Sequence, residues 1–138
     1  MTILYTALWI ILDLLTKYLF YDLSIWNNIF WPIKNHGISY SMLSGQTIYI
    51  ISITIIILAI IVYIYYKGQI SKISYILIMA WGVGNLIDRV IYGYVRDFVY
   101  VWNWFPVFNV ADILIFCGCM LIFYQIRNAN LQETKTQP

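Results

Sequence analysis

The segment IYIISITIIILAIIVYIYY, residues Ile48 to Tyr66, decides the fold class because it is long, apolar and free of charge. A membrane-spanning helix needs about 20 mostly apolar residues. A transmembrane β-strand needs only about 10 residues, which alternate between apolar and polar. The length and the uniform character of this segment therefore predict a helix that crosses a membrane.

The composition of the whole chain agrees with this prediction. The 138 residues are 62% hydrophobic and 10% charged, with a mean hydropathy of +0.77. A soluble domain is about 45–50% apolar and about 25% charged, so this chain has too much apolar surface to bury in a small globule. The net charge of +2 gives no reason to expect a nucleic-acid partner. The start, MTILYTALWI, lacks a basic stretch and a small-residue cleavage site, so we expect an uncleaved first span.

Four segments have the length of a span, and together they predict an all-α membrane protein. The expected spans are about 2–21, 48–66, 70–91 and 109–127, within one transmembrane domain (1–127) that is followed by a polar tail (128–138). Four spans place both termini on one side of the membrane. Two connections remain on the other side, residues 22–47 and the strongly aromatic residues 92–108. Since Trp and Tyr favour the headgroup level, we expect 92–108 to lie on the membrane surface.

The orientation follows from the basic residues of the loops, which are enriched on the cytoplasmic side of a membrane protein. Four of them flank the side of the termini and two lie on the other side: Lys67, Lys72, Arg127 and Lys135 against Lys34 and Arg96. This count predicts cytoplasmic termini. A count that adds Lys17 and Arg89, at the ends of spans, is even.

Polar residues inside the spans are candidates for function, because a charge at the bilayer centre costs about 2.5–3.5 kcal/mol. They form three sets at helical spacing: Asp13 with Lys17, Asn85 with Asp88 and Arg89, and Asn109 with Asp112. The topology brings all three sets, and Asp97 in the aromatic connection, to one membrane face. Spacing alone does not establish that Asp97 and Asp112 touch.

Each set also has a purely structural interpretation. The structural interpretations are an ion pair that lets the first span insert (Asp13 and Lys17), anchoring at the interface (Asp88 and Arg89), a solvated loop pair (Arg96 and Asp97) and a helix N-cap (Asn109).

Cys117 and Cys119 are two residues apart on one helix and are expected to be small core residues. The single His36 cannot by itself form a multi-histidine metal site, and we expect neither a metal nor a cofactor.

Five short motifs occur in order along the chain: DLLTK (13–17), NHGISY (35–40), GNLIDR (84–89), GYVRDF (93–98) and FNVAD (108–112). In this order, over about residues 10 to 125, they resemble the bacterial lipoprotein signal peptidases, which are the type II signal peptidases. Four positions depart from the usual family pattern: Leu14 is often Gln, Trp81 replaces a small residue, Arg96 an apolar residue and Ile113 a serine. None of these changes removes an acidic residue.

The resemblance implies a four-helix transmembrane bundle, a small extracytoplasmic β-like cradle from the first connection, and a short surface element from the aromatic one. It implies that Asp97 and Asp112 are the catalytic aspartates of a membrane aspartic protease. Supporting or substrate-binding roles fall to Asp13, Lys17, Asn35, Gly37, Asn85, Asp88, Arg89 and Asn109. The implied enzyme is a monomer in the bacterial cytoplasmic (inner) membrane, in contact with membrane lipid, with its site near the outer face. The implied substrate is a prolipoprotein whose cysteine carries diacylglycerol, cut just before that cysteine.

The residue types fit this chemistry independently of the resemblance. With one histidine and two cysteines inside a span, a pair of carboxylates is the remaining route to peptide hydrolysis. Two other classes stay open. A proton- or ion-coupled transporter also carries charges inside the membrane, but would need them across the bilayer. A non-catalytic assembly factor would keep its function after Asp97 and Asp112 were changed to Asn.

Overall fold

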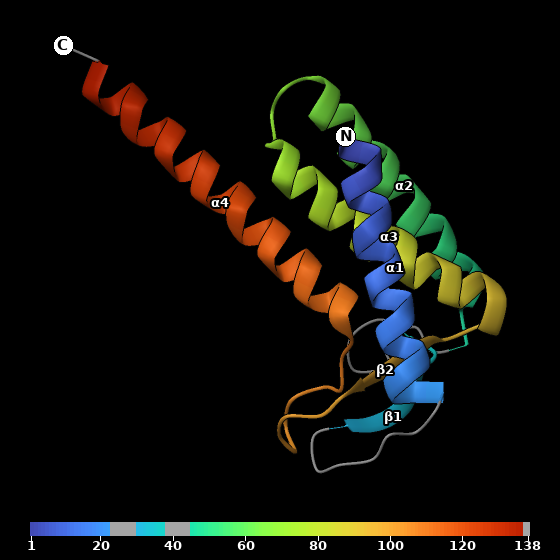
Figure 1. The fold of residues 1–138 in the computed structure, drawn as a ribbon. Coiled ribbons are helices and arrows are strands. Elements are labelled where there is room, and N and C mark those ends of the chain that lie inside the picture. The colour runs from blue at the N-terminus through green and yellow to red at the C-terminus, as the bar shows by residue number, and fades with distance from the viewer. Residues whose placement is uncertain (23–29, 38–44, 137–138) are drawn as a thin grey trace.

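A computed structural model describes residues 1–22, 30–37 and 45–136. The helices are α1 (Thr2–Lys17), continued by the π-helical turn η1 (Tyr18–Asp22), α2 (Thr47–Tyr66), α3 (Lys72–Tyr92) and α4 (Val110–Thr136), and the strands are β1 (Phe30–Asn35) and β2 (Val95–Val99) (Figure 1). Four helical stretches of the described chain are long and apolar enough to cross a membrane: Thr2–Asp22, Thr47–Tyr66, Lys72–Tyr92 and Val110–Ala129. The all-α membrane fold with four spans is confirmed.

The helix boundaries follow local sequence signals. Ser71 caps α3, because its side-chain oxygen accepts a hydrogen bond from the Ser74 backbone N–H at 3.1 Å. Gly93 ends α3 in the left-handed conformation, with φ of +77°, which glycine adopts at little cost. The helix α4 continues beyond the expected end of its span, through part of the polar segment 128–138, as far as Thr136.

The central element of the bundle is α3. It contacts α1, α2 and α4, and 44% of its span is buried, against 11–17% for the other three. Figure 1 shows α4 leaning away from the other helices toward its C-terminal end. Cys117 and Cys119 on α4 are exposed, so the expectation that they are core residues is wrong. In a membrane an apolar side chain is as stable facing lipid as it is in the protein core, so hydrophobicity does not reveal the buried side of a helix.

The two strands lie at the end of the bundle opposite both chain termini (Figure 1). They pair antiparallel, with Ile33 opposite Asp97 and Asn35 opposite Val95. The expected β-like cradle is therefore built by both connections, because the first supplies β1 and the aromatic one supplies β2. Residues 23–29 and 38–44, which complete the first connection and the second motif, lie outside the described residues.

The aromatic connection divides into two parts. Four of the five residues of β2 are buried, whereas Trp102 and Trp104 in the following loop are 62% and 71% exposed. The loop is therefore exposed on the surface of the protein and the strand is not, and the expected position of 92–108 at the membrane surface stays a prediction. This division places Asp97 inside the protein, at the end of the bundle where the spans bring their polar residues.

Candidate functional site

The start of α4 organises the site. The Asp112 backbone N–H donates to Asn109 Oδ1 at 3.2 Å, and the Asn109 backbone N–H donates to Asp112 Oδ2 at 3.0 Å. This reciprocal pair is a capping box, which satisfies two N–H groups that a helix start leaves free. The expectation that Asn109 is an N-cap is confirmed. The cap also fixes the Asp112 carboxyl in the first turn of the helix.

The same asparagine holds Asp97. The Asn109 side-chain amide donates to Asp97 Oδ1 at 2.6 Å, and the Asn35 amide on β1 donates to Asp97 Oδ2 at 2.8 Å. Asp97 is 2% exposed. Burial, and next the nearby charge of Asp112, raise the pKa of the Asp97 carboxyl from 3.8 to about 7. The structure therefore brings Asp97 and Asp112 onto one common partner, which spacing alone did not establish.

Asn85 on α3 connects this carboxylate pair to the buried charges. Its side-chain N–H donates to Asp112 Oδ1 at 3.4 Å, and its Oδ1 accepts from Asn109 at 3.3 Å and from Lys17 Nζ at 2.9 Å. Trp81, one of the departures from the family pattern, lies one helical turn before Asn85 and interacts with the Asp112 carboxyl through its side chain. Asn85 thus joins the pair to a second, fully buried cluster.

That cluster is centred on Lys17. Its ammonium group lies 2.7 Å from Asp13 Oδ2 and 3.2 Å from Asp88 Oδ2, and all three side chains are inaccessible to solvent. Asp13 Oδ1 accepts a hydrogen bond from the Ala111 backbone N–H at 3.0 Å, which ties α1 to the start of α4. Asp13 and Lys17 form an ion pair, as the structural interpretation held, but the pair also joins three helices.

Arg89 and Gly37 link α3 to the end of β1. The Arg89 guanidinium donates to the Gly37 carbonyl at 2.9 Å, and the Gly37 N–H donates to Asn35 Oδ1 at 3.0 Å. The second of these bonds holds the Asn35 side chain, whose amide donates to Asp97. All ten residues singled out from the sequence therefore meet at one end of the bundle.

Sequence reasoning missed Arg96, which supports the site, and the ion pair that Arg96 forms with Asp22 outside it. Arg96 is 5% exposed and pairs with Asp88 at 2.9 Å and with Asp22 at 2.5 Å. The interpretation of Arg96 and Asp97 as a solvated loop pair is wrong, and so is simple interface anchoring by Asp88. The departure of Arg96 from the family pattern was the available signal, but its partner could not be deduced from it.

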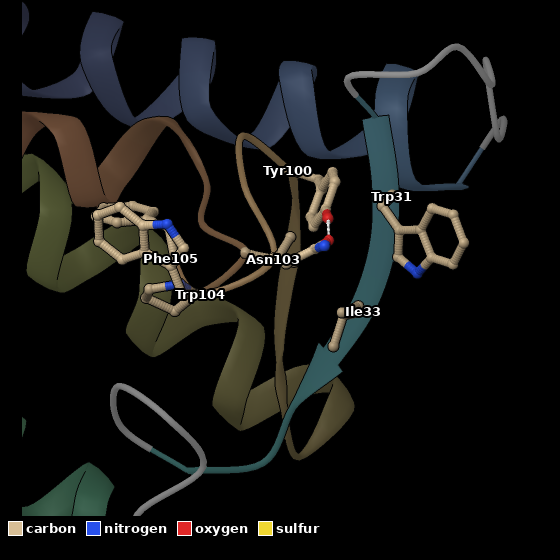
Figure 2. Close-up of a pocket in the computed structure, with 8 residues that line it drawn as sticks. Trp31, Ile33, Tyr100, Asn103, Trp104 and Phe105 are labelled. Atoms are coloured by element: carbon tan, nitrogen blue, oxygen red, sulfur yellow. Dashed lines mark hydrogen bonds between the residues drawn. The ribbon is translucent and has the colours of Figure 1, made fainter.

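A groove of about 410 Å³ lies between β1 and the loop that follows β2. It is lined by Trp31, Ile33, Tyr100, Asn103, Trp104, Phe105, Pro106 and Val107. Figure 2 shows Trp31 and Ile33 on β1, Trp104 and Phe105 on the loop after β2, and the Tyr100 hydroxyl bonded to Asn103 between them. Ile33 is the strand partner of Asp97, but neither Asp97 nor Asp112 is among the residues that line the groove. Within 1–22, 30–37 and 45–136, no three His, Cys, Asp or Glu side chains gather so that they could hold a metal ion.

The fold and the site define a multi-pass membrane protein with two carboxyl groups joined by an asparagine at one end of its bundle. The chain belongs to the signal peptidase (SPase) II family, whose model matches residues 5–127. It is similar to the lipoprotein signal peptidases of Clostridium tetani (34% identity, 98% of each chain) and Clostridium acetobutylicum (37% identity, 88% of this chain and 90% of that one).

A solved structure has the same fold. It is described as a bacterial membrane enzyme and superposes with a TM-score of 0.81 at 29% identity, over 99% of this chain and 91% of that one. The recognition of the family from its five motifs is confirmed, and the protein is a peptidase. The transporter alternative finds no support.

Proposed function

We propose that the protein is a membrane aspartic endopeptidase that cuts diacylglyceryl-modified prolipoproteins just before the modified cysteine. The observation that carries the proposal is the double role of Asn109, whose backbone N–H binds Asp112 and whose side chain binds Asp97. The substrate class is supported by the name lipoprotein signal peptidase, which both clostridial relatives bear.

The two carboxyls have different environments, which supports a division of labour. Asp97 is buried, and its pKa of about 7 favours the neutral acid below that pH. Asp112 accepts a backbone N–H in the first turn of α4, where the helix dipole favours a negative charge. The charge of Asp112 opposes the ionisation of Asp97, so the two carboxyls share one proton.

The reaction then balances as follows. Asp112 takes a proton from water, the hydroxide adds to the scissile carbonyl carbon, and Asp97 gives its proton to the carbonyl oxygen. When the tetrahedral intermediate collapses, Asp97 regains that proton and Asp112 gives its proton to the leaving amine. Cleavage is expected to decline as the pH rises through about 7, because Asp97 then loses the proton it donates.

The other polar side chains of the motifs hold this pair in place. Asn35 and Asn109 fix both oxygens of Asp97, and Asn85 bonds Asp112. The buried cluster of Asp13, Lys17 and Asp88, together with the bond from Arg89 to Gly37, joins the elements that carry these asparagines. We assign these residues supporting roles.

We propose that part of the substrate binds in the groove of Figure 2, one wall of which carries Ile33, the strand partner of Asp97. We propose that the diacylglyceryl group lies in the lipid phase between helices and that the exposed Trp102 and Trp104 guide it, since indole rings favour the headgroup level. We further propose that the enzyme is a monomer of the bacterial inner membrane, with cytoplasmic termini and its site near the outer face. The excess of basic loop residues on the side of the termini supports this orientation.

The deciding experiment is a cleavage assay with purified protein and a lipidated precursor peptide. D97N and D112N should each lower the rate at least 10²-fold, because general acid–base catalysis contributes about 10²–10⁴. D22N is the matched control, since Asp22 is a partly exposed aspartate whose ion pair with Arg96 leaves both carboxyls untouched. If D97N and D112N fold and cleave within tenfold of wild type, the aspartic mechanism is wrong.

A further inference from the structure

Arg96 makes an unusually complete contact with one carboxylate. Its backbone N–H donates to Asp88 Oδ2 at 3.0 Å, while its side-chain Nε and second terminal nitrogen donate to Asp88 Oδ1 at 3.2 and 2.9 Å. The main chain and the side chain of Arg96 on β2 thus both bind the carboxylate of Asp88 on α3. The strand cannot slide or rotate against α3 without breaking several of these bonds together, and Asp97 is the next residue on that strand.

Charge gives the contact a second consequence. Asp13 and Asp88 are both fully buried and lie 2.7 and 3.2 Å from the single ammonium group of Lys17. Arg96 supplies a second cation, so two buried anions face two buried cations. Without Arg96, Lys17 would be the one remaining ion-pair partner of Asp88 among the described residues, and Lys17 also donates to Asn85, the partner of Asp112. An uncompensated buried charge is strongly unfavourable, so we expect these side chains to rearrange.

Arg96 is poorly placed to contact the substrate. It is 5% exposed, its guanidinium lies over the Tyr92 ring at 4.6 Å, and its remaining terminal nitrogen bonds Asp22 at the end of η1. All of its described partners belong to the protein's own framework. Its action on the reaction would therefore pass through other residues.

We propose that Arg96 is a positioning residue for the peptidase reaction: it locks β2 to α3 and neutralises Asp88, and thereby holds Asp97 in register with Asp112. An apolar residue is common at this position in the family pattern that the motifs resemble, so the proposal concerns the arginine of this chain. The proposal rests on the proposed function, because it takes Asp97 and Asp112 to be the reacting pair.

The test compares R96V, R96K and the control D22N in the lipidated-peptide assay, with thermal unfolding measured for each. R96V should lower kcat about 10- to 100-fold and change KM less than threefold, because a displacement of about 1 Å at reacting groups costs about 10² in rate. R96K keeps the charge but lacks the planar fork that fits a carboxylate. It should fold, with kcat three- to tenfold below wild type. D22N should stay within twofold.

Each outcome of this test either supports or overturns the role of Arg96. If R96K and a folded R96V have kcat within twofold of wild type, Arg96 does not position the pair. If KM rises while kcat is unchanged, Arg96 acts on substrate binding and the proposal is equally wrong. If R96V does not fold, the kcat of R96K decides alone. If wild type itself leaves the lipidated peptide uncut, the proposed function fails and this inference fails with it, whereas an active wild type with unaffected Arg96 variants overturns the inference only.

Discussion

Changing Asp97 to Asn should remove activity and make the protein more stable at pH 8. Burial and the nearby Asp112 raise the pKa of Asp97 from 3.8 to about 7. Between these two values the folded protein holds a proton that the unfolded chain has released. Stability therefore falls as the pH rises from about 4 through about 7, and the full loss is present above that pH. An asparagine, which is neutral at every pH, abolishes this loss.

The magnitude follows from the same pKa difference. One pKa unit corresponds to about 1.4 kcal/mol, so ionised Asp97 destabilises the fold by about 4 kcal/mol above pH 7. The amide group of the new asparagine can accept only one of the two bonds from Asn35 and Asn109, which costs about 1.5 kcal/mol. The net gain is about 2–3 kcal/mol, or roughly 5–10 °C in melting temperature for a chain of this size.

The assay is thermal unfolding of wild type and D97N in the same detergent, followed at pH 5 and pH 8. At pH 5 most of the difference should vanish, because the folded state then keeps Asp97 neutral, and the unfolded chain gains only about 1.6 kcal/mol by ionising it, which the lost hydrogen bond of the asparagine offsets. The pH 5 measurement is therefore an internal control. A D97N protein that melts at the same temperature as wild type at pH 8, or below it, would refute the reasoning that Asp97 is a carboxyl held in its neutral form.

Three further predictions address orientation, substrate and packing. A cysteine placed at Asn103, in a background without the native cysteines, should react with an impermeant reagent only from the outer side of the membrane; reaction only from the cytoplasmic side would reverse the proposed orientation. A precursor peptide with an unmodified cysteine should be cut at least tenfold more slowly than the lipidated form, and equal rates would show that the lipid is not recognised. Gly84→Ala should lower stability by about 1–3 kcal/mol, because the added Cβ would lie 2.6 Å from Oδ2 of the ion-paired Asp13. Gly82→Ala is its control in the same melting experiment and should cost less, since the group it meets is the flexible end of Leu58.

Some features of the fold could be predicted from sequence because they depend on local or nearly local properties. The spans were predictable because each must carry enough apolar residues to cross a bilayer. The cap at Asn109 was predictable because a helix start leaves N–H groups free, and an asparagine three residues before Asp112 can satisfy them. The polar sets on α1, α3 and α4 were predictable because a charged side chain inside a membrane costs free energy and so marks a special position.

Other features depend on contacts between segments far apart in the chain. Cys117 and Cys119 face outward, because the side of α4 that meets α3 is chosen by packing and not by hydrophobicity. The β-like cradle required a partner for β1, and that partner proved to be the strand that carries Asp97. The salt bridge from Arg96 to Asp22 spans 74 residues, so no periodicity could reveal it.

By itself, therefore, the sequence determined that this is a four-span membrane protein and which residue types can do its chemistry. Both follow from the cost of placing particular side chains in lipid. The tertiary structure alone decided that Asp97 and Asp112 share Asn109, and that Arg96 fixes the strand beside them. The physical reason is that hydrogen bonds and ion pairs act over about 3 Å. Whether two residues come that close depends on how the helices and strands pack, which the spacing within any one segment does not contain.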